Sequence, residues 1–186
     1  MADNKLVFLP NEIWLNIAAY CDPKDLWLSL RLINRQLQAC VEQHFIDDIL
    51  PQSAITLPIA LPSYDVRNPL HGKAILRYQE RKKGDGGEEG GHQPLYSLLR
   101  VEPAHYRAQL LDRWERMREV AGGQVGDKLH WNLRLRHASV RMPLKDARIE
   151  GDQSLEAGSG RLSFDWRPTF SRFFQSIYPG QVYWSW

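Results

Sequence analysis

The sequence has few of the features that mark secreted proteins, membrane proteins or dedicated nucleic-acid binders. It contains only two cysteines, without the dense spacing of a disulfide scaffold or a zinc site, so we expect a reducing compartment. No apolar run approaches the roughly 18 residues that a membrane-spanning helix needs. The formal net charge is only +2, whereas nucleic-acid binders usually carry a strong basic excess. We therefore expect a cytoplasmic or nuclear protein that binds neither nucleic acid nor a membrane.

The chain does have enough apolar material for a folded core, because 43% of its 186 residues are hydrophobic. Its charge is divided unevenly. Residues 1–50 carry four basic and seven acidic side chains, a balance of −3, and the remaining residues carry 20 basic and 15 acidic side chains, a balance of +5. The two parts of the chain therefore differ in electrostatic character.

Residues 6–50 have the pattern of a small helical module. Apolar side chains recur at helical spacing after Pro10, and Asp22-Pro23 predicts the start of a second helix. We expect that helix to run through four apolar positions, Leu26, Leu30, Ile33 and Leu37. An apolar stripe continues to about Leu50, where the first of several prolines excludes a continuous helix.

The rest of the chain predicts a connector, a loop and a second domain. Residues 51–78 are expected to form an extended connector, and residues 79–94, rich in glycine and charge, a flexible loop. Residues 95–186 are expected to form a domain with one main helix and an antiparallel sheet. The elements expected there are a helix at about 103–121, strands at about 128–136 and 161–167, and a short helix at about 168–176. The predicted fold class is α+β.

The helical module resembles the F-box. The family pattern is Leu-Pro-x-Glu-Leu/Ile, an Ile four residues on, Asp-Leu at the next helix, and Val-x-Arg followed by an apolar position. This sequence has Leu9-Pro10-Asn11-Glu12-Ile13, Ile17, Asp25-Leu26, Leu30 and Ile33-Asn34-Arg35-Gln36-Leu37. Ala18 and Tyr20 stand where the family usually has larger aliphatic or Phe side chains. The resemblance covers residues 8–48, and the layout looks most like fungal F-box proteins.

The resemblance implies a three-helix module that binds the Skp adaptor of a cullin–RING ubiquitin ligase, while the rest of the chain recruits a protein substrate. It implies an adaptor rather than an enzyme, with no catalytic residues, no cofactor and no metal. The motif positions implied to bind the Skp adaptor are Leu9, Pro10, Glu12, Ile13, Ile17, Asp25, Leu26, Leu30, Ile33 and Arg35.

Two regions of the second domain are candidates for substrate binding. Lys128, His130, Arg134 and Arg136 alternate along the first predicted strand, so they share one face and suit an acidic or phosphorylated segment. A solvated sheet face is the common alternative for such a pattern. The second candidate is the aromatic terminus, Tyr183, Trp184 and Trp186, which either anchors a partner or folds back onto the sheet.

Two other functions stay open beside the ubiquitin-ligase subunit. One is an interaction protein that uses the module to bind the Skp adaptor without joining a full ligase. The other is a small ligand-binding or hydrolytic domain within residues 95–186, although no Gly-x-Ser-x-Gly motif or phosphate-binding loop supports it.

Overall fold

The computed structural model describes residues 9–60, 71–79, 93–120, 129–151 and 160–178. The described chain divides into two compact units, residues 9–49 and residues 50–178. We call them the helical unit and the sheet unit. The division at Ile49–Leu50 lies next to the boundary that the sequence predicts at residue 50.

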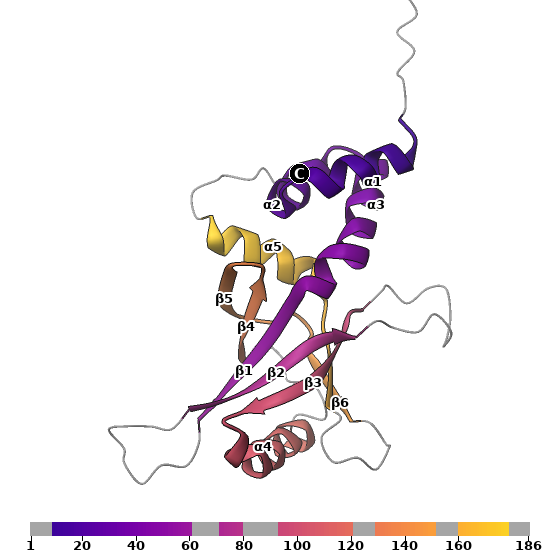
Figure 1. The fold of residues 1–186 in the computed structure, drawn as a ribbon. Helices are drawn as coiled ribbons and strands as arrows, with labels where there is room; N and C mark the ends of the chain where they lie inside the picture. The colour runs from indigo at the N-terminus through magenta and orange to yellow at the C-terminus, as the bar shows by residue number, and fades with distance from the viewer. Residues whose placement is uncertain (1–8, 61–70, 80–92, 121–128, 152–159, 179–186) are drawn as a thin grey trace, which may run out of the picture. The chain divides into compact units, whose positions relative to one another are not determined.

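The helical unit contains three short α-helices (Figure 1). They are α1 (Asn11–Tyr20), α2 (Pro23–Leu28) and α3 (Arg35–His44), with a 3-10 turn, η1 (Leu30–Leu32), before α3 and a π-helical turn, η2 (Phe45–Ile49), after it. Two of these helices begin at side-chain caps. Asp22 accepts a hydrogen bond from the backbone N–H of Lys24, and Asn34 accepts one from that of Leu37.

The core of the helical unit is built around Trp27 and Phe45. Their ring centroids lie 4.5 Å apart, and both side chains are buried. The guanidinium of Arg31 lies 4.0 Å from the centre of the Trp27 ring and pairs with Glu42 at 3.5 Å. These contacts connect α2 and η1 to α3, so one aromatic pair and one partly buried ion pair hold the second half of the unit together.

The expected second helix through residues 26–37 is wrong. The chain leaves the helix at Ser29 and enters α3 only after Asn34, whose backbone is extended. The reason is local: the Asn34 side chain bonds the N–H of Leu37, and this cap begins a new helix rather than continuing the old one. Leu30 and Ile33 therefore do not lie on the same helical stripe as Leu26.

The sheet unit is built on one seven-stranded antiparallel sheet, curled like half of a barrel, with the strand order β5-β4-β1-β2-β3-β7-β6 (Figure 1). After a 3-10 turn, η3 (Leu50–Gln52), the strands follow in the chain as β1 (Ser53–Ala60), β2 (His71–Gln79), β3 (Leu95–Glu102), β4 (His130–Leu135), β5 (Ala138–Pro143), β6 (Arg148–Gly151) and β7 (Gly160–Ser163). The fold is thus α+β, with the N-terminal helices followed by an antiparallel sheet.

The expectation of a connector over residues 51–78 is wrong for its described residues, which form the end of η3, β1 and β2. Both strands lie in the interior of the sheet, where β1 pairs with both β2 and β4. Residues 61–70 lie outside the described residues. Ile55 and Leu57 of β1 are buried, with Thr56 between them only partly buried. This alternation is the strand period. Residues 80–92 of the predicted loop lie outside the described residues.

Two sequence-based boundaries in the sheet unit also change. The predicted strand over 161–167 ends at Ser163, because Asp165 accepts a hydrogen bond from the N–H of Arg167 and so caps α5 (Trp166–Ile177). The predicted helix over 103–121 begins as a 3-10 turn, η4 (Ala104–Tyr106), and continues as α4 (Arg107–Val120). Between the two predicted strands, the structure has two further ones, β5 and β6.

One face of the sheet carries the core. Its buried side chains include Ile55, Leu76, Tyr96, Trp131, Leu133 and Leu162. Helix α4 packs on this face through Trp114, whose ring meets that of Trp131 edge to face at 6.2 Å. Helix α5 contacts β5, and its first turn is fixed by Thr169, which donates to the carbonyl of Asp165 and accepts from the N–H of Lys145. On the other face of β1–β5, the described side chains include exposed and partly buried ones; we call it the exposed face.

Candidate protein-docking surfaces

The helical unit exposes large apolar side chains that a small unit would be expected to bury. Those of α1 are Ile13, Ile17 and Tyr20, with exposed fractions of 43%, 38% and 93%. Residues at i, i+4 and i+7 lie on one side of a helix, so these three form a stripe, which we call the α1 stripe. Leu32 and Ile33, exposed by 54% and 65%, form a second group at η1. Such apolar exposure is typical of a protein-interaction surface.

The α1 stripe exists because α1 has apolar side chains on two sides. Ala18 is its only buried residue, and Trp14 is partly buried four residues earlier on the same side. The start of the helix is fastened to α3, since the Gln36 side-chain amide donates to the Leu9 carbonyl at 2.9 Å and to the Asn11 side chain at 2.8 Å. One side of α1 thus packs in the core of the helical unit, and the α1 stripe on its other side is exposed.

The motif residues divide into surface and core. Pro10 is the N-cap of α1 and exposed, Glu12 lies in the first turn of α1, and Asp25 lies in the first turn of α2. Both carboxylates lie where the helix dipole favours negative charge. Arg35 is exposed at the start of α3, and Leu9 and Leu30 are partly buried. Leu26 is only 1% exposed and belongs to the core of the unit. Its expected contact with the Skp adaptor stays a prediction.

Sequence reasoning did not place Tyr20 and Leu32 among the docking residues. Tyr20 continues the spacing of Ile13 and Ile17, so helical periodicity alone would have found it. Leu32 could not be found that way, because its exposure depends on the break between α2 and α3 that separates η1 from both helices.

The basic residues predicted on one strand face are only partly brought together. His130 and Arg134 are exposed on β4, two pleats apart on the same side. Arg136 is outside the strand: it lies in the turn to β5 with φ 52°, and its Nε donates to the Gln52 side chain at 3.5 Å. Lys128, Tyr183, Trp184 and Trp186 lie outside the described residues. Among the described residues, the predicted face thus keeps His130 and Arg134 and loses Arg136 to the turn.

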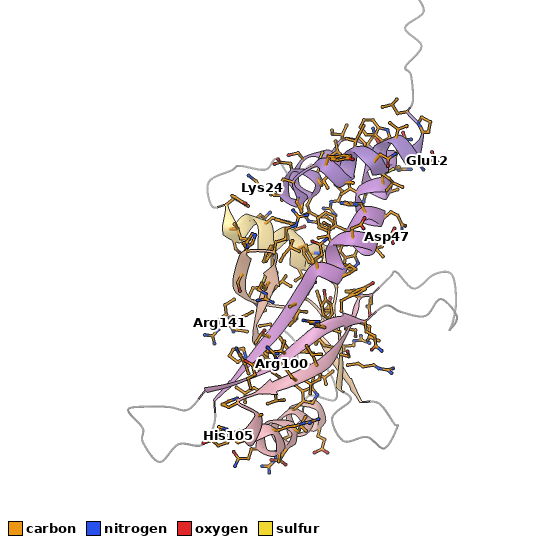
Figure 2. The ribbon with its side chains drawn as sticks, viewed as in Figure 1. Glu12, Lys24, Asp47, Arg100, His105 and Arg141 are labelled. Atoms are coloured by element: carbon orange, nitrogen blue, oxygen red, sulfur yellow. The ribbon has the colours of Figure 1, made fainter. Side chains whose placement is uncertain are left out.

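Arginines of other strands also lie on the exposed face. Ala54 of β1 is paired on one side with Arg77 of β2 and on the other with Arg134 of β4. In the next row, Thr56 is paired with Ile75 and Asn132, which are in turn paired with Arg100 of β3 and Arg141 of β5. Figure 2 labels Arg100 and Arg141 on their strands. Residues from all five strands β1–β5 thus share one surface.

Three ionisable side chains have shifted pKa values, each with a physical cause. The hydrogen bond from Lys73 holds the pKa of Glu102 below its usual range, and Arg100 adds to this effect. Burial raises the pKa of the Cys40 thiol, and the charge of Glu12 adds to the increase. Burial also raises the pKa of Tyr96, whose hydroxyl bonds the Ser53 hydroxyl inside the sheet unit.

Among the described residues, no three His, Cys, Asp or Glu side chains gather as metal ligands would, and Cys21 and Cys40 are free thiols. Within the same ranges, no helix is long and apolar enough to cross a lipid bilayer.

Comparison with known proteins adds no relative. No protein-family model matches the chain, no curated protein matches it, and no solved structure matches its fold. The proposed function therefore rests on the residues of this chain and their geometry.

Proposed function

We propose that this chain is a substrate-recruiting F-box subunit of a Skp–cullin–F-box ubiquitin ligase. The α1 stripe is the observation that carries the proposal. Ile13 and Ile17 occupy the apolar positions of the F-box pattern that begins at Leu9-Pro10, and both are exposed. In this proposal the Skp adaptor covers the α1 stripe and the sheet unit holds a protein substrate.

The energetics of the helical unit support a bound partner. A unit of some 40 residues rarely has a sufficient core of its own. Complete burial of a large aliphatic side chain contributes about 1.5–3 kcal/mol. Covering the exposed parts of Ile13, Ile17 and Ile33 would therefore stabilise a complex with the adaptor. Part of that gain is offset by the entropy lost on association.

The proposed mechanism is proximity. The adaptor and its cullin hold the helical unit, while the sheet unit holds the target near the ubiquitin-loaded enzyme of the ligase. A lysine of the target then meets the activated ubiquitin at high effective concentration. The chain itself performs no chemistry.

The test is capture of the purified full-length chain by an immobilised Skp adaptor. The variant Ile13→Glu with Ile17→Glu places two charges on the α1 stripe without touching the buried side of α1. Leu99→Glu is the matched control, because Leu99 is an apolar side chain of the sheet unit with a similar exposed fraction, 49%. We expect capture of the wild type and of the control, and a loss of at least about tenfold for the α1 variant.

Each outcome decides the proposal. If the adaptor does not capture the wild type, the chain is not an F-box subunit. If the α1 variant binds like the wild type, the α1 stripe is not the docking surface. Adding cullin separates the ligase subunit from an interaction protein that binds the adaptor alone: retention of cullin on the captured complex supports the ligase, and its exclusion supports the alternative.

A further inference from the structure

Among the described residues, the exposed face of the sheet carries more cations than carboxylates. On the part formed by β1–β5 we define the cationic face by Lys73, Arg77, Arg100, Arg134 and Arg141, all of which are exposed. Lys73 and Arg100 share one carboxylate, Glu102, each at 2.7 Å. Arg77, Arg134 and Arg141 form no ion pair with any residue in the part of the chain that the structure describes.

The registers place these cations around a floor of small side chains. Arg77 and Arg134 lie on strands that flank Ala54, so their Cα atoms are about 10 Å apart across two strand spacings. A hollow of about 650 Å³ adjoins this row, lined by Thr56, Pro58, Lys73, Glu102 and Asn132 among others. The cationic face is thus a shallow depression with a low floor and long charged side chains around it.

From this arrangement we propose that the cationic face binds an acidic protein segment, one rich in Asp and Glu, with the arginines contacting its carboxylates. Arginine suits this task, because its planar guanidinium forms paired hydrogen bonds to a carboxylate. The cationic face already binds one carboxylate, since Glu102 pairs with both Lys73 and Arg100. The statement that this segment belongs to a substrate rests on the proposed function. The statement that the cationic face binds an acidic segment is tested separately.

One observation favours an acidic protein segment over a nucleic acid. Proteins that hold single-stranded nucleic acids use aromatic side chains for stacking, and in the described residues of β1–β5 the side chains of the exposed face include no Phe, Tyr or Trp.

The test measures binding of a fluorescein-labelled oligoglutamate peptide to the full-length chain by fluorescence anisotropy. The variant Arg77→Glu with Arg134→Glu reverses the two charges that flank Ala54. Arg107→Glu with Arg172→Glu is the matched control, because both arginines are exposed on helices and the net charge changes by the same amount. We expect the face variant to weaken binding by at least about tenfold and the control by less than about twofold.

A third variant provides a gain of affinity. Glu102→Gln removes the carboxylate that competes for Lys73 and Arg100, so we expect tighter binding of the peptide. Binding of all forms is expected to weaken between about 50 mM and 300 mM salt, since exposed charges are screened.

The outcomes that overturn the proposal are distinct. Absence of peptide binding by the wild type at low salt overturns it, as does an equal loss in the face variant and the control, which would indicate net charge alone. Tighter binding of a polyuridylate RNA of equal charge would assign the face to nucleic acid instead. Capture by the Skp adaptor is measured on the same variants: the face variant is expected to retain it, so the surface and the adaptor function fail independently.

Discussion

The helical unit and the sheet unit differ in what they leave exposed. The helical unit exposes apolar side chains, Ile13, Ile17 and Ile33 among them, whereas the sheet unit buries most of its large apolar side chains and exposes arginines on its free face. Their sizes explain the difference. Three short helices cannot enclose every apolar side chain they carry, whereas a curled seven-stranded sheet with two helices can enclose one complete face.

The difference also has consequences for binding. Apolar surfaces gain free energy in proportion to the area removed from water, with little dependence on salt. Charged surfaces gain mainly in selectivity and association rate, and salt weakens them. Variants in each unit therefore test whether the two units behave as differently as their surfaces suggest.

Phe45→Ala is expected to have the largest effect. The side chain is fully buried against Trp27, and removing a buried Phe costs about 3–5 kcal/mol, which is a large share of the stability of a unit this small. Urea unfolding monitored by Trp fluorescence and far-UV circular dichroism should show an early transition for the helical unit, with the transition of the sheet unit retained. A single transition shifted as a whole would show that the units unfold together.

Tyr96 is expected to make the sheet unit sensitive to alkali. Burial raises its pKa in the folded state, while an unfolded tyrosine ionises near pH 10, so its contribution is complete below that pH and is lost as the pH rises further. The limiting slope is about 1.4 kcal/mol per pH unit for one proton. Urea midpoints at neutral pH and above pH 10 measure this effect. In Tyr96→Phe the alkaline loss should be smaller, and an unchanged loss would contradict the assignment.

Removal of the helix caps is expected to cost about 1 kcal/mol in each unit. Asn34→Ala leaves the N–H of Leu37 unbonded at the start of α3, and Asp165→Ala does the same to the N–H of Arg167 at α5. Urea midpoints measure both losses. Only Asn34→Ala should also weaken capture by the Skp adaptor, because α3 supports α1 through Gln36. Equal weakening by both variants would contradict a docking surface confined to the helical unit.

Glu102→Gln is expected to have the smallest effect on stability. Its carboxylate is solvent-exposed, and exposed ion pairs contribute little because water and salt screen them. Its pKa is lowered in the folded state, so any contribution exists above the unfolded pKa and disappears as the pH falls through the acidic range. The urea midpoint at neutral pH should not change measurably, while peptide affinity rises. A clear destabilisation would show that Glu102 has a structural role instead.

Within the helical unit the sequence anticipated much of the structure, because the relevant interactions are local. The cap at Asp22 and the start of α2 at Pro23 follow from neighbouring residues, and so does the stripe formed by Ile13 and Ile17. The break at Asn34 was missed because apolar spacing across residues 26–37 suits one helix as well as two. Side-chain capping decided between them.

In the sheet unit the sequence determined the strand period and the α+β class, and the tertiary structure decided the surface. Arg134 was recognisable as an exposed residue of a strand from its alternating neighbours alone. Its partner in the cationic face, Arg77, was not, because antiparallel pairing brings β2 and β4 to either side of Ala54. Strand order and register are set by burial of one whole face against the core, which depends on residues far apart in the chain. Local patterning thus determines which residues alternate, and only the packed sheet determines which of them meet.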